Sequence, residues 1–139
     1  MASRILVPMD DSELAALALE HALDEHPDAE ITVLHVVGGG SPMMGEAASV
    51  ALADEVEGAA REQADEVFES ARGIAAERGR ELDTELAFGS PAKVIVERAA
   101  EFDAVVMGTH GGTLSERLFS GNVAERVFRR SPVPVTTVR

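Results

Sequence analysis

The chain has 139 residues, of which 45% are hydrophobic and none is cysteine, which predicts one folded domain over residues 1–139 and excludes disulfides and thiolate metal sites. It carries 25 acidic against 12 basic side chains, a net charge of -13, and this charge repels nucleic acids and anionic membranes, so we expect neither as a partner. The absence of cysteine and of a long apolar span favours the reducing cytoplasm as its location.

The first half of the chain alternates between strands and helices. A short apolar run over residues 4–9 predicts a buried strand, and Ser12 after it predicts the N-cap of a helix. A second apolar run, residues 31–37, leads into a glycine-rich loop over residues 38–47, and the long helix that follows ends at Gly79 as a C-cap. The residues expected to face the core recur every three or four positions: Ala15, Ala18, Leu19, Ala22 and Leu23 in the first helix, and Leu52, Val56, Ala60, Ala64, Val67, Ala71 and Ile74 in the second, residues 47–78.

The second half continues the alternation. A weaker strand over residues 82–88 precedes Pro91, which suits the first turn of a helix. The fully apolar residues 104–107 predict a central strand, and residues 133–138 predict the last one. The core-facing residues expected in the two helices of this half are Ala92, Ile95, Val96 and Ala99 in the first, and Val123, Ala124, Val127 and Phe128 in the second, residues 121–130.

Apolar strands joined by helices predict a parallel sheet covered on both faces, a doubly wound α/β domain. Pro132 and Pro134 flank Val133, and proline is tolerated mainly at strand starts and sheet edges. We therefore expect the last strand at an edge of the sheet, where it can pair with a second copy of the chain. Ligands of such sheets bind beyond the carboxyl ends of the strands, where the strand order reverses.

The loop after the fourth strand is the most informative segment at that edge. Gly108 and Gly111 are followed by nine residues and then by Gly121 at the start of a helix. Glycine lets backbone amides approach a phosphate closely, and a helix start adds N–H donors. The loop is neither a P-loop nor a dinucleotide fingerprint, because it lacks a Gly-Lys-Ser/Thr triplet and does not follow the first strand.

These glycines resemble the nucleotide loop of the universal stress protein family. The resemblance covers nearly the whole chain: residues 5–10 and 34–37 are similar to the first two strands of that family, residues 107–111 and 123–127 to its last helical unit, and residues 132–135 to its last strand. It implies a five-stranded parallel sheet in the order 3-2-1-4-5 and a homodimer formed through the last strand. It also implies ATP binding in one branch of the family and no nucleotide in another.

The resemblance further implies which residues hold the nucleotide. Asp10 matches an acidic residue near the ribose and adenine, where a carboxylate accepts hydrogen bonds from hydroxyl groups or helps to hold Mg²⁺. The backbone of Val36 matches the position that pairs with the adenine edge. The full set implied for the ATP site is Pro8, Met9, Asp10, Val36, Met107, Gly108, Thr109, His110, Gly111, Arg117, Gly121, Asn122 and Val123.

Several residues depart from this pattern or have a simpler role. Asn122 stands where the ATP-binding pattern has Ser or Thr, and Gly112 stands where a basic residue is common, which leaves Arg117 as the one cation in the loop. Asp10 and Asp11 also suit the cap of the first helix. The simpler expectation for His35 is a core histidine with its hydrogen bonds satisfied, and that for His110 is a turn or packing residue.

The charge has its own interpretation. Eleven of the twelve basic residues are arginine, and Lys93 is the one lysine. Acid-rich, lysine-poor surfaces suit proteins that stay soluble in concentrated salt, where ions screen the self-repulsion. We interpret the chain as halophilic, and the alternative is an ordinary acidic protein.

Two functions follow from these observations. The first is a homodimeric regulatory module that binds ATP with Mg²⁺ and reports stress to an unidentified protein partner, as the ligand orders the loops over residues 38–47 and 109–120. Hydrolysis is expected to be slow at most, because the phosphate loop has no lysine, so we do not expect a dedicated enzyme. The alternative is a nucleotide-free dimer that acts by binding its partner. A phosphoryl receiver is disfavoured, because the third strand ends at Phe88 without an aspartate.

Overall fold

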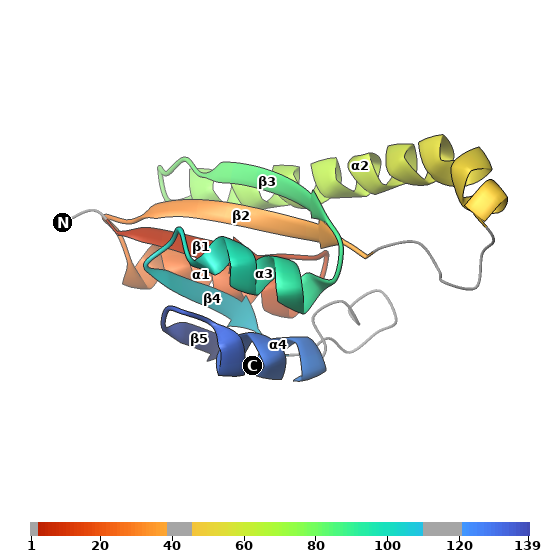
Figure 1. Ribbon diagram of the computed structural model, residues 1–139. Coiled ribbons are helices and arrows are strands. Elements are labelled where there is room, and N and C mark those ends of the chain that lie inside the picture. Colours follow the sequence, from red (N-terminus) through yellow and green to blue (C-terminus); the bar gives the residue numbers. More distant parts are fainter. Residues whose placement is uncertain (1–2, 39–45, 110–120) are drawn as a thin grey trace.

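The computed structural model describes residues 3–38, 46–109 and 121–139, and within them the side chains of residues 46–57 and 121–122 are outside the description (Figure 1). Strands and helices alternate along these ranges, as the hydrophobic pattern predicts. In chain order the elements are β1 (Arg4–Pro8), α1 (Glu13–Glu25), β2 (Glu30–Val37), α2 (Glu46–Ala76), β3 (Asp83–Phe88), α3 (Pro91–Ala99), β4 (Ala104–Gly108), α4 (Gly121–Arg130) and β5 (Val135–Val138).

The strands form one parallel sheet in the order β3-β2-β1-β4-β5, which confirms the expected fold class. In the central strand, Ile5 lies opposite Ile31 of β2 on one side and Ala104 of β4 on the other. The chain passes outward from β1 through β2 to β3 and then crosses back to β4. The strand order therefore reverses between β1 and β4, which is the place where sheets of this kind bind ligands.

Helices cover both faces of the sheet, α1 and α2 one face and α3 and α4 the other (Figure 1). Alternation along β1 explains both layers, since Ile5 and Val7 pack beneath α1 and α2 while Leu6 packs beneath α3 and α4. Each fully buried side chain of this size stabilises the fold by roughly 1.5–3 kcal/mol. All five residues of the first helix that the spacing assigns to the core are buried.

The ends of the helices follow local signals in the sequence. Ser12 is the N-cap of α1, and its Oγ accepts a hydrogen bond from the Ala15 amide at 3.1 Å. Pro91 opens α3, as expected. Beyond α2, Gly79 has a φ of 65° and the amide of Arg80 donates to the Ala75 carbonyl at 2.9 Å, the bond of a glycine C-cap.

Two expectations about the last helix and strand need correction. Phe128 is 65% exposed, so its assignment to the core was wrong: the buried stripe of α4 runs through Ala124 and Val127, and Phe128 lies at its edge. The last strand begins at Val135 rather than Val133, because Pro134 has no amide to donate and contributes only its carbonyl, which accepts from the Val105 amide at 2.9 Å. The strand does lie at the edge of the sheet. No helix in the described ranges is both long and apolar enough to span a bilayer.

Candidate functional site

The carboxyl ends of β1, β2 and β4 lie side by side and carry many of the predicted site residues. Pro8, Met9 and Asp10 follow one another at the end of β1, and the amide of Met9 donates to the carbonyl of Leu34 in β2 at 2.8 Å. Val36 is buried near the end of β2. At the end of β4 are the buried Met107, Gly108 and the partly exposed Thr109.

Asp10 is the one charged group buried at this edge among the described residues, with 2% of its surface exposed. Its Oδ1 accepts a hydrogen bond from the amide of Ser12 at 2.9 Å, which shapes the turn into α1. Its Oδ2 is buried and has no hydrogen-bond partner among the described residues. Burial raises the pKa of Asp10 above its ordinary value, hydrogen bonds from Ser12 oppose the rise, and the charge of Asp11 adds to it. An unpaired buried acceptor is a costly group, and a donor from a ligand would satisfy it.

His35 has the structural role expected of it. It is 1% exposed, and its Nδ1 lies 2.9 Å from the carbonyl oxygen of Met9, so the Nδ1–H donates to that carbonyl. The edge of its ring meets Phe68 of α2 in a T-shaped contact with centroids 6.5 Å apart. His35 therefore holds the end of β1 in place immediately before Asp10.

Gly108 is required by packing against α1. A Cβ built on Gly108 would lie 3.1 Å from the Cβ of Leu14 and 3.3 Å from its carbonyl carbon. The first turn of α1 thus crosses the end of β4 in direct contact with its backbone. The sequence predicts a phosphate-facing role for this glycine, and the packing is a separate reason for it that the spacing of glycines does not reveal.

Other predicted site residues lie at the second loop. His110, Gly111 and Arg117 are outside the described residues. So are residues 39–45 and 110–120, which make up most of the loops over residues 38–47 and 109–120 in which ligand-dependent ordering is expected. Gly121 and Asn122 form the first turn of α4, so the second glycine does open a helix at the same edge of the sheet. In the described part of the chain, no three histidine or acidic side chains form a group able to hold a metal ion.

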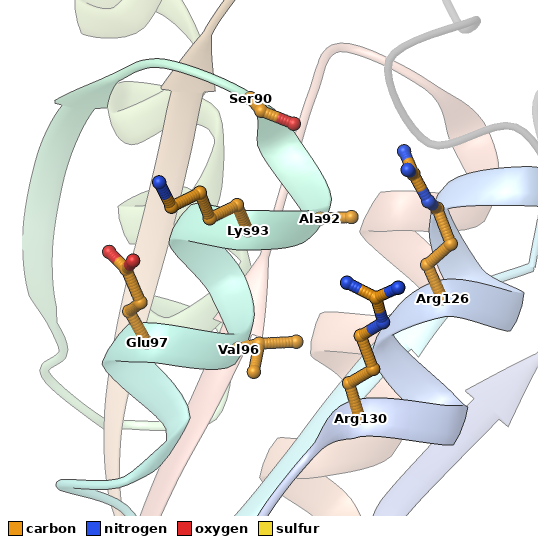
Figure 2. Close-up of a pocket in the computed structure, with 7 residues that line it drawn as sticks. All are labelled: Ser90, Ala92, Lys93, Val96, Glu97, Arg126 and Arg130. Carbon is orange, nitrogen blue, oxygen red and sulfur yellow. The ribbon is translucent and has the colours of Figure 1, made fainter.

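A second feature, which the sequence analysis did not identify, is a pocket between α3 and α4. Its volume is about 370 Å³. Figure 2 shows Arg126 and Arg130 extending from α4 along the side that faces α3, and Ala92 and Val96 of α3 pointing toward them. The signal in the sequence was the spacing of the two arginines, which places them on one face of a helix. The complete lining is Ser90, Ala92, Lys93, Val96, Glu97, Arg126 and Arg130.

The sheet order defines a doubly wound α/β protein. The buried carboxylate of Asp10 lies where that order reverses, between β1 and β4, which is the place where sheets of this kind bind ligands. The chain belongs to the universal stress protein family, whose model matches residues 1–139.

Proteins similar to this chain carry the name of the same family. The universal stress protein MJ0531 of Methanocaldococcus jannaschii is 36% identical, over 98% of this chain and 81% of that protein. The solved structure of UspA from Lactobacillus plantarum aligns with a TM-score of 0.80 at 26% identity, over 99% of this chain and 97% of that one. A universal stress protein from Archaeoglobus fulgidus, solved in complex with dAMP, aligns with a TM-score of 0.68 at 21% identity, over 100% of this chain and 98% of that one, which shows the shared fold.

Proposed function

We propose that this chain is a regulatory protein of the stress response that binds ATP at the carboxyl ends of β1 and β4, where the strand order reverses. The observation that carries the proposal is the buried Oδ2 of Asp10, which no donor reaches in the part of the chain that the structure describes. A hydroxyl group of the nucleotide's ribose is a donor of the kind that this oxygen needs. The complex of the Archaeoglobus protein with dAMP supports the proposal, because that protein binds an adenine nucleotide on the same fold.

The start of α4, at the same edge of the sheet, fits a nucleotide in its chemistry. The first turn of α4 at Gly121 and Asn122 offers backbone N–H groups and the positive end of a helix, which favour phosphate. A Mg²⁺ ion that accompanies ATP would take most of its ligands from phosphate oxygens and water, with Asp10 as the protein carboxylate. Such an ion also reduces the repulsion between the triphosphate and a chain of net charge -13.

The test is a calorimetric titration of ATP with Mg²⁺ into the wild-type protein and into Asp10→Asn. The substitution keeps an oxygen for the Ser12 amide and replaces the unpaired acceptor by an amide donor. We expect saturable binding to the wild type and a loss of affinity of about tenfold in Asp10→Asn, the usual range for a hydrogen bond to a charged group.

Asp11→Asn is the matched control, because it removes the same charge from an exposed neighbour. Its affinity should stay within about twofold of the wild type, as expected for an exposed charge screened by solvent. Equal losses of ATP affinity in both variants would mean that the loss comes from the change in net charge and not from a contact with Asp10. No binding by a folded wild-type protein would contradict the proposal and favour the nucleotide-free branch, to which Asn122 already points.

We also propose that the protein is a homodimer paired through β5. This strand pairs with β4 on one side only, and Thr136 and Thr137 are exposed. An unpaired edge of this kind is a template for another strand. Light scattering should give twice the chain mass of 14.7 kDa, and a monomer at that mass would contradict the dimer without touching the nucleotide site.

A further inference from the structure

The pocket between α3 and α4 concentrates positive charge on a strongly acidic protein. Lys93, Arg126 and Arg130 line it against a single carboxylate, that of Glu97. These three cations are a quarter of the 12 that the chain has, whereas its acidic residues number 25. Their grouping gives a local positive field on an otherwise acidic surface, and such a field favours an anionic ligand.

The cations of this pocket differ from Arg78, Arg98 and Arg129, which form ion pairs with carboxylates of the chain. Within the described residues, no carboxylate lies within ion-pairing distance of Lys93, Arg126 or Arg130. Other described arginines do have such partners: Arg78 pairs with Asp24, Arg98 with Glu85 and Glu101, and Arg129 with Glu125. Arg129 belongs to the same helix as the two arginines of the pocket but does not line it.

The spacing of the two arginines adds to the argument. Arg126 and Arg130 are four residues apart on α4, so their like charges lie on one helical face, an arrangement that destabilises a helix unless an anion bridges the pair. Figure 2 shows both arginine side chains on the α4 side of the pocket, across from Ala92 and Val96, while Lys93 and Glu97 project from the other side of α3. Two planar donor groups beside an apolar wall suit bidentate contacts to a phosphate.

We propose that Arg126 and Arg130 bind a small phosphate-bearing anion in the pocket between α3 and α4, at a site separate from the nucleotide site proposed at Asp10. A volume of about 370 Å³ lies at the lower end of the range of small-molecule sites and admits an anion of the size of pyrophosphate. At the outer side of the pocket, the charge of Lys93 adds to the positive potential of the two arginines, and the charge of Glu97 reduces it. The Ser90 hydroxyl also lines the pocket and makes no capping bond to α3, so it is available as a further donor.

The experiment is a titration of inorganic pyrophosphate followed by the amide signals of α3 and α4 in NMR spectra. We expect saturable shifts in the wild type, and affinities at least about tenfold weaker in Arg126→Gln and Arg130→Gln, as for the loss of a charge-assisted hydrogen bond. Both side chains are exposed, so the variants should remain folded. Arg129→Gln is the control: it removes the same charge from the same helix outside the pocket, and its affinity should stay within about twofold of the wild type.

Two further titrations, one of Asp10→Asn and one in the presence of ATP, identify the site at which pyrophosphate binds. Pyrophosphate binding that persists in Asp10→Asn and in saturating ATP belongs to a separate site, as proposed. Binding that Asp10→Asn abolishes belongs to the proposed nucleotide site and overturns the proposal. ATP carries phosphate groups itself, so displacement of pyrophosphate by ATP counts against the proposal only where Arg126→Gln and Arg130→Gln leave the affinity for pyrophosphate unchanged. Absence of saturable shifts in the wild type, or an equal loss in Arg129→Gln, overturns it as well, and neither result bears on ATP binding at Asp10.

Discussion

Gly108→Val should lower the free energy of unfolding by about 2 kcal/mol or more, the usual effect of overfilling a packed interior. The new Cβ would lie 3.1 Å from the Cβ of Leu14 and 3.3 Å from its carbonyl carbon, and the valine methyl groups add further volume. Leu14 cannot retreat easily, because the Ser12 cap and the Asp10–Ser12 hydrogen bond fix the first turn of α1. Propensity alone gives the opposite sign, since valine favours strands and glycine does not.

The same substitution, glycine to alanine, made at two positions separates this packing effect from the effect of the added methyl group itself. Gly108→Ala should destabilise the protein, whereas Gly73→Ala on α2 should stabilise it by roughly 0.5–1 kcal/mol, because no atom lies near the added Cβ and alanine favours the helix. Urea unfolding monitored by circular dichroism measures both. Leu14→Ala should not rescue Gly108→Val, because the contacts involve Leu14 atoms that alanine retains. Equal stability of Gly108→Val and the wild type would show that α1 moves away freely.

The same contact shows what sequence reasoning can reach. Strands, helices and the inward faces of α1 and α3 follow from periodicity because burial repeats with the geometry of each element. The order of the strands came from the family resemblance, since alternation alone does not state which strands are neighbours. The packing of Leu14 on Gly108 joins α1 to β4 across most of the chain, and no local pattern encodes such a pair.

The two candidate sites differ in the same way. The family resemblance predicts Asp10 as a site residue, and its burial and unpaired oxygen agree with a special role. The pocket was missed because its lining comes from α3 and α4, which only the fold brings together. The expectation for Phe128 is wrong for a related reason. Spacing predicts the direction in which a side chain leaves the helix, but the packing of neighbouring elements decides whether a side chain in that direction is buried.

Asp10 should also make the stability of the protein depend on pH in an unusual direction. Its pKa is raised in the folded state by burial, so the folded protein binds this proton more tightly than the unfolded chain does. Between the ordinary carboxyl pKa and the raised one, the free energy of unfolding therefore falls as the pH rises, by about 1.4 kcal/mol for each unit of difference. Below this window the proton is bound in both states, and above it the full destabilisation remains.

The measurement is urea unfolding of the wild type and Asp10→Asn over this pH range at constant salt. Because the variant lacks the titrating group, its stability relative to the wild type should rise with pH through the window and then level off. Asp11→Asn, which removes an exposed carboxylate, should keep most of the wild-type profile. A relative stability of Asp10→Asn that falls with pH would mean that the folded state favours the ionised carboxylate.

Binding of ATP should remove most of this pH dependence if the nucleotide proposal holds. A ribose hydroxyl that donates to Oδ2 stabilises the ionised form of Asp10 and lowers its pKa, so ATP should bind more tightly as the pH rises through the same window. Repeating the unfolding series with saturating ATP should then remove most of the fall seen in the free protein. If the free energy of unfolding falls as steeply with pH when ATP is bound, the nucleotide does not contact Asp10. In that case Oδ2 still lacks a donor, so the pKa of Asp10 stays raised.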